Sequence, residues 1–113
     1  MALAEHSAKA IGSGVSCGSW TEARRSDNSL AYQAWIAGFV SGANLIATID
    51  FPTIDILAQL QPQNPQPIYA WVDNYCSENP LNTIGDAADW LGNELLRRAA
   101  AASGTTLPPN KRQ

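Results

Sequence analysis

The sequence is poor in charge, and its basic residues are few. Charged residues make up 15% of the 113 residues, and seven lysines and arginines stand against ten acids, for a net charge of -3. Four of the basic residues form two isolated pairs, Arg24 with Arg25 and Arg97 with Arg98. A nucleic-acid interface needs clustered basic side chains that displace counterions from phosphate. We therefore expect no nucleic-acid partner.

Histidine is almost absent, and this limits the chemistry open to the chain. A serine nucleophile needs an ordered base beside it, and the single histidine, His6, lies in a segment without apolar periodicity. Two cysteines and one histidine also fall short of the four ligands of a structural zinc site. Four acidic residues offer an alternative cation site or carboxylate pair: Asp73, Glu78, Asp86 and Asp89. Helix capping and the helix dipole explain the last two as well, so we predict no enzymatic activity, no metal and no cofactor.

The two cysteines are the next constraint. One disulfide between Cys17 and Cys76 uses both and leaves no free thiol, and such bonds persist in oxidising compartments. It would close a long loop and stabilise the fold by roughly 4 kcal/mol on the chain-entropy model. The alternative is a cytosolic protein with two buried, reduced thiols. No stretch before Cys17 is typical of a signal peptide, so we expect an exported protein whose signal peptide has been removed.

Hydrophobic residues make up 45% of the chain, enough for one core in a chain of ordinary domain size. Loose composition predicts a flexible segment at 1–16 and a flexible tail at 103–113. One helical domain is predicted over 17–102. Within it, Ser19 and Glu22 have the spacing of a capping box and predict a short first helix near residues 19–25.

A central helix is predicted over residues 30–49, where aromatic and aliphatic side chains recur at helical spacing. This stretch has no charged residue over about twenty positions, the length that spans a bilayer. Its polar residues, with the small residues gathered on one face, argue against membrane insertion. Gly38 and Gly42 instead predict a place where another helix, from this chain or from a second copy, comes close.

Three further helices are predicted after the central one. Asp50 and Pro52 suit a brief helix start, and Pro67 suits the start of the next helix, which carries Cys76 on its apolar side. Thr83 and Asp86 form a second capping box before the last helix. The prediction is an all-α bundle of four to five helices closed by one disulfide.

The chain resembles the HdeA-like proteins and the Tai/Rap immunity proteins of type VI secretion, which are small exported helical proteins of bacteria. The residues that carry the resemblance are CGSWTEAR, AYQAWIAGFVSGAN and IYAWVDNYCSENPLNTIGDAADWLGNEL, with WVDNYC followed by NPL as the most specific part. The resemblance covers 17–96 and implies a helical bundle, a disulfide between these two cysteines, a periplasmic location and often a homodimer. Immunity proteins inhibit a cell-wall amidase by covering its active site. Acid-activated chaperones of the HdeA kind are lysine-rich, whereas Lys9 is the only lysine here outside the tail.

We predict a periplasmic protein that binds another protein, as an immunity inhibitor of a secreted cell-wall amidase. The alternatives are an acid-stress chaperone that acts on unfolded clients, or a structural or interaction protein, and a homodimer is possible in each case. A proline-rich loop at 61–66 and a tryptophan off the core stripe of the last helix are the candidate contacts. The predicted binding residues are Gln61, Gln63, Asn64, Gln66 and Trp90.

Overall fold

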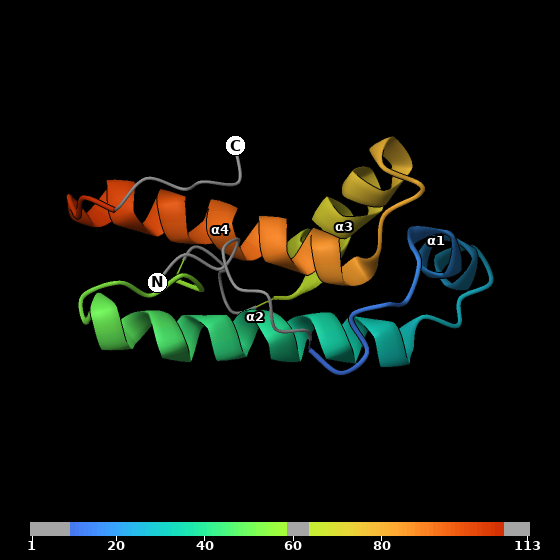
Figure 1. Ribbon diagram of the computed structural model, residues 1–113, viewed down its shortest axis with the longest axis horizontal. Helices are drawn as coiled ribbons and strands as arrows, with labels where there is room; N and C mark the ends of the chain where they lie inside the picture. The colour runs from blue at the N-terminus through green and yellow to red at the C-terminus, as the bar shows by residue number, and fades with distance from the viewer. Residues whose placement is uncertain (1–9, 59–63, 108–113) are drawn as a thin grey trace.

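Four helices form a bundle in the computed structural model, which describes residues 10–58 and 64–107 (Figure 1). They are α1 (Cys17–Arg25), α2 (Leu30–Asp50), α3 (Gln66–Glu78) and α4 (Ile84–Ser103). The long helices α2 and α4 lie side by side and run in the same direction, while α3 packs on α4 and α1 packs on α3 at one end. A disulfide joins Cys17 to Cys76. The predicted all-α bundle with one disulfide is confirmed, and the described residues contain no strand.

The helix ends agree with the sequence prediction at α4 and differ at α1. The Thr83 side chain accepts from the Asp86 amide at 3.1 Å and Asp86 accepts from the Thr83 amide at 3.1 Å, which confirms the capping box. The predicted box of Ser19 and Glu22 is wrong, because α1 begins two residues before Ser19. Ser16 caps it by accepting from the Ser19 amide at 3.0 Å. Asp86 is therefore explained by its cap.

The brief helix predicted after Asp50 is absent, and residues 51–58 form turns instead. The Asn44 side chain of α2 forms two hydrogen bonds to this segment. Its Oδ1 accepts from the Ile56 amide at 2.8 Å, and its Nδ2 donates to Asp55 Oδ1 at 2.9 Å. Such side-chain bonds compete with the backbone bonds of a helix. Ile54 and Ile56 then both reach the core, which a helix could not arrange because residues two apart lie on different faces.

The core is lined by one face of each long helix. On α2 the buried residues are Ile36, Val40, Ala43 and Ala47. On α4 they include Ile84, Ala88, Leu91 and Leu95, which recur at helical spacing. Of the four tryptophans, Trp20 is the fully buried one, and Trp35 and Trp71 are half-buried at the edge of the core.

Residues 10–16 pack against the bundle, although the sequence predicted a flexible segment as far as residue 16. The Ile84 amide donates to the Val15 carbonyl at 2.8 Å, and the Gly85 amide donates to the Ser13 carbonyl at 3.1 Å. The Trp35 indole N–H donates to the Ile11 carbonyl at 2.6 Å. A Cβ at Gly85 would lie 2.6 Å from that Ser13 oxygen, so this approach requires glycine. The segment therefore satisfies two amides at the start of α4 that a helix leaves without partners.

The outer face of α2 is not covered by the described chain. A Cβ built at Gly38 or Gly42 would meet nothing within 4 Å. Of the two predicted possibilities, a helix of the same chain is not found at these glycines within the described residues. Helix α2 is also long and apolar enough to cross a membrane, a test that core helices and signal sequences pass too, and 22% of its 18-residue window is buried.

Candidate protein-binding surface on α1

Helices α1 and α3 pack in opposite directions, and their contacts form a regular series. Cys17 of α1 faces Cys76 of α3 with a Cα separation of 5.0 Å. One turn farther along, Trp20 faces Asp73, and the Trp20 and Tyr69 rings lie 6.4 Å apart between centroids. The disulfide and the aromatic contact thus fix both the position and the rotation of α1 on α3.

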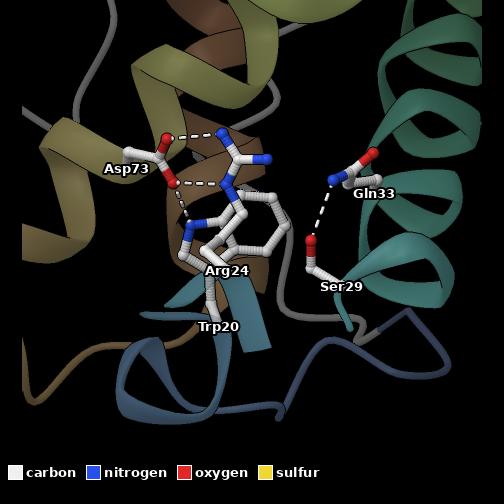
Figure 2. A network of polar contacts seen from close by, with 5 residues as sticks. All are labelled: Trp20, Arg24, Ser29, Gln33 and Asp73. Atoms are coloured by element: carbon white, nitrogen blue, oxygen red, sulfur yellow. Dashed lines mark hydrogen bonds and ion pairs between the residues drawn. The ribbon is translucent and has the colours of Figure 1, made fainter. Parts of the chain in front are cut away.

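The Asp73 carboxylate is the polar centre of this contact (Figure 2). Its Oδ1 accepts from the Trp20 indole N–H at 2.8 Å and from Arg24 Nε at 3.0 Å, and its Oδ2 accepts from Arg24 Nη2 at 2.8 Å. The guanidinium carbon of Arg24 also lies 5.5 Å from the centroid of the Trp20 ring. The hydrogen bond with Asp73 raises the pKa of Arg24 above its usual value, against the opposing effect of burial. Both oxygens of Asp73 are therefore used within the fold, which gives it a structural role in place of the considered cation site.

A second polar contact in Figure 2 holds the start of α2. Gln33 Nε2 donates to Ser29 Oγ at 2.8 Å, and the Gln33 amide donates to the Ser29 carbonyl at 2.9 Å. Ser29 is buried, and the bond to Gln33 satisfies its hydroxyl. The junction between α1 and α2 is therefore fixed by specific polar contacts as well.

Helix α1 turns most of its side chains outward. Only Cys17 and Trp20 of its nine residues are buried. A cleft of about 550 Å³ lies on one side of the helix, lined by Thr21, Arg24, Arg25, Asp73 and Ser77. A second cleft of about 550 Å³ lies on the other side, lined by Ser16, Gly18, Ser19, Glu22, Ala23, Ser26, Asn28 and Tyr32. All the exposed residues of the helix line one of these clefts, and we call them the α1 face: Gly18, Ser19, Thr21, Glu22 and Arg25.

The binding residues predicted from sequence lie elsewhere. Gln61 and Gln63 fall outside the described residues. Asn64 and Gln66 are exposed at the start of α3, where Asn64 Oδ1 accepts from the Gln66 amide at 3.1 Å. Trp90 lies on α4 with 38% of its surface exposed. These residues belong to two different elements, and neither is α1.

Sequence reasoning missed the contribution of Arg24 and Asp73, although a signal was present. Trp20 stands three residues after Cys17, and Asp73 stands three residues before Cys76. Once the cysteines pair between antiparallel helices, residues one turn from each must meet. The disulfide therefore predicts the contact of Trp20 with Asp73, and Arg24 follows one turn later on the same face.

Within residues 10–58 and 64–107, no group of three or more histidine, cysteine, aspartate or glutamate side chains is placed to hold a metal ion. The polar side chains around α1 are arginines, hydroxyls and carboxylates, which suit recognition of a polar protein surface. Comparisons of the chain with known protein families, with curated proteins and with solved structures give no match.

Proposed function

We propose that this protein works in the periplasm by binding another protein through the α1 face, without catalysis. The observation that carries the proposal is that α1 buries two residues of nine but is fixed by a disulfide and by three hydrogen bonds to Asp73. A surface that is already held rigid loses little conformational entropy when a partner binds to it. The disulfide is compatible with an oxidising, exported compartment.

The form of binding that we favour is inhibition of a secreted cell-wall amidase, which is what the resemblance to immunity proteins implies. An inhibitor of this kind has to cover an active site that accepts polar cell-wall material. The α1 face carries hydroxyls and one exposed ion pair, between Glu22 and Arg25. Such a mixed face can pair with the polar rim of an active site.

Capture from periplasmic extract and from secreted proteins of neighbouring bacteria tests the proposal. Thr21 is exposed and lines a cleft, so Thr21→Arg should obstruct docking without disturbing the core. Ala101→Arg places the same side chain at an exposed position on α4 and serves as control. We expect the wild type and the control to retain one partner that Thr21→Arg loses. The purified partner should hydrolyse cell wall. The wild type should inhibit this hydrolysis, and Thr21→Arg should not.

Trp90 provides the competing surface for the same function. Its indole is 38% exposed, and tryptophan is enriched at the energetic centres of interfaces. If Trp90→Ala abolishes capture while Thr21→Arg does not, the contact surface is on α4 and the proposal for α1 is wrong. If neither change matters, protein binding by both surfaces is refuted.

A chaperone is the second candidate, favoured by the large exposed apolar side chains of α2. Apolar surface of this kind binds unfolded chains. A chaperone activated by acid should bind an apolar dye and suppress client aggregation only below about pH 3, where carboxylates are protonated. Absence of both effects at that pH excludes this candidate.

A further inference from the structure

The outer face of α2 is the largest gathering of exposed apolar side chains in the described chain. Four large ones lie on this helix: Leu30 (77% exposed), Leu45 (70%), Ile46 (47%) and Ile49 (77%). Smaller residues on the same side are also exposed: Ala31, Ala34, Gly38, Ser41 and Thr48. Helical spacing centres this set opposite the buried face of α2, which packs mainly on α4 (Figure 1). We call it the α2 outer face.

We infer that the α2 outer face binds a neutral lipid surface, with α2 parallel to the bilayer and partly immersed among the headgroups. A helix binds in this way when its apolar side enters the boundary between the headgroups and the acyl chains. The opposite side of α2 stays in the core, where its buried residues are Ile36, Val40, Ala43 and Ala47. The helix therefore remains in the bundle and does not cross the bilayer.

The polar groups of the face favour lipid over a protein partner. A protein interface carries about one hydrogen bond for each 100–200 Å². The face has two hydroxyls, those of Ser41 and Thr48, and the Thr48 hydroxyl already donates to the Leu45 carbonyl at 2.7 Å. The backbone groups of a helix are bonded within it. Acyl chains need no hydrogen bond from the protein, so a face with so few polar groups suits lipid.

Charge decides which lipid the face fits. No lysine or arginine occurs between Arg25 and Arg97, a stretch that includes all of α2. Recognition of anionic lipids needs clustered basic side chains near the surface, and anionic lipids repel a chain with net charge -3. An exposed acid stands at each end of the face, Asp27 before α2 and Asp50 as its last residue. The ammonium groups of zwitterionic headgroups complement these carboxylates, whereas anionic headgroups do not.

Residues 10–16 extend the apolar surface along one edge of the face. The Trp35 indole N–H donates to the Ile11 carbonyl, which holds Ile11 beside α2, and the Ile11 side chain is almost fully exposed. The Trp35 and Phe39 rings, 5.4 Å apart between centroids, are half-buried along the same edge. Tryptophan is favoured at the level of the headgroups, where its ring contacts apolar chains while its N–H keeps a polar partner. This edge therefore suits the same boundary.

Lipid binding and the proposed function use different helices, since the α1 face belongs to α1 and the lipid face to α2. The capture experiment tests the first surface and vesicle binding tests the second. Each claim can therefore fail without the other.

Cosedimentation with phosphatidylcholine vesicles tests the inference with Gly38→Glu. We expect the wild type to bind these vesicles, and to bind less as phosphatidylglycerol replaces part of the phosphatidylcholine. Gly38→Glu puts a carboxylate in the middle of the face and should weaken binding at least about tenfold. The Cβ at this position meets nothing within 4 Å, so the melting temperature should not fall. Ala101→Glu adds the same charge at an exposed position on α4 and should bind like the wild type.

A second variant tests the apolar contribution without a change of charge. Leu45→Ser with Ile49→Ser removes two large exposed side chains from the face, and we expect vesicle binding at least about tenfold weaker. Leu81→Ser is the matched control, because it removes an almost fully exposed leucine from the turn between α3 and α4. It should bind like the wild type. An equal loss in the control would mean that vesicle binding does not depend on the α2 outer face, and would refute the inference.

Four further outcomes overturn the inference. A wild-type chain that stays in the supernatant at millimolar phosphatidylcholine does not bind neutral lipid. Tighter binding to phosphatidylglycerol vesicles would make the lipid anionic. Binding that resists extraction with alkaline carbonate would mean that α2 crosses the bilayer. If vesicles are not bound but the wild type forms a dimer, or suppresses client aggregation, and Gly38→Glu abolishes that property, the occupant is a second copy or an unfolded chain.

Discussion

Helix α1 and residues 51–58 flank α2 in the chain and are held in contrasting ways. Helix α1 has two buried residues, a disulfide to Cys76 and a charge-assisted contact to Asp73. Residues 51–58 also have two buried residues, Ile54 and Ile56, but no disulfide: the Asn44 side chain binds them, and the Phe51 amide donates to the Ala47 carbonyl at 2.9 Å. The comparison shows that burial of two residues does not decide the local structure. The polar contacts decide whether the segment is a helix, as in α1, or a series of turns, as in residues 51–58.

Removing the disulfide should lower the free energy of unfolding the most. It would leave α1, like residues 51–58, without a covalent cross-link to the rest of the fold. We expect Cys17→Ala with Cys76→Ala to lower the free energy of unfolding by roughly 4 kcal/mol, because a loop with a sequence separation of 59 regains its freedom when unfolded. Urea unfolding of the variant and of the reduced wild type measures this, and the two should agree. Equal midpoints for the oxidised and reduced protein would contradict the covalent tie as the main support of α1.

Removing the charged contact should come next. Asp73→Ala leaves the buried Trp20 indole N–H and the Arg24 guanidinium without their acceptor. We expect a loss of about 2 kcal/mol, less than the 3–5 typical of a fully buried pair, because the side chains of Arg24 and Asp73 are 30% and 38% exposed. Asn74→Ala, at the exposed neighbouring position, is the control for urea unfolding and should change little. A loss no greater than that of the control would mean that the disulfide alone positions α1.

Asn44→Ala tests the other segment. It removes the acceptor of the Ile56 amide and the partner of Asp55, and we expect a loss of about 1 to 2 kcal/mol. Hydrogen exchange should accelerate at Ile56 while the amides of α1 keep their protection. Thr48→Ala is the control, since the Thr48 hydroxyl donates to the Leu45 carbonyl of its own helix at 2.7 Å. Equal acceleration in both variants would show that Ile54 and Ile56 hold the segment without Asn44.

Glu94 gives the smallest expected effect, because it joins residues of one helix only. It accepts from Arg97 and from Arg98, the latter at 2.6 Å. Burial raises the pKa of Glu94, but the two arginines outweigh burial and hold the pKa below its usual value. A lowered pKa stabilises the fold fully above the ordinary glutamate pKa near about 4.3, and this contribution is lost as the pH falls from there through the lowered pKa of the folded protein.

We therefore expect Glu94→Gln to cost less than about 1 kcal/mol at neutral pH, because both arginines are largely exposed. Thermal melting at pH 7 and at pH 3 measures it, and the variant should match the wild type at the lower pH. Glu22→Gln breaks an ion pair with Arg25 in which both side chains are mostly exposed, and it should have less effect still. A difference that persists at pH 3 would rule out ionisation of Glu94 as the cause.

Much of the fold follows from sequence because its signals are local. Thr83 and Asp86 at one end and Gly104 at the other mark α4, and Gly104 does adopt a left-handed conformation with φ of 74°. The apolar stripe of α4 and the buried position of Cys76 follow from helical periodicity alone. These features depend on neighbours within a few residues, which is why one sequence suffices to predict them.

The errors fall where distant residues decide the local structure. The turns at 51–58 depend on Asn44, and the start of α1 depends on Ser16, whose backbone position is set by the contact of residues 10–16 with α4. The spacing of Ser19 and Glu22 also fits a helix cap. Only the tertiary contact of residues 10–16 shows that α1 is capped by Ser16 and not by Ser19. The candidate surface on α1 was missed for the same reason, since Arg24 and Asp73 are 49 residues apart.

The disulfide also divides the chain by topology. Residues 18–75, with all of α2, lie inside a covalent ring, whereas α4 lies wholly outside it. Proteolytic cleavage at one peptide bond inside the ring leaves a single molecule whose two pieces separate only on reduction. Cleavage between α3 and α4 releases the C-terminal fragment at once, so gels run with and without reductant distinguish the two kinds of site.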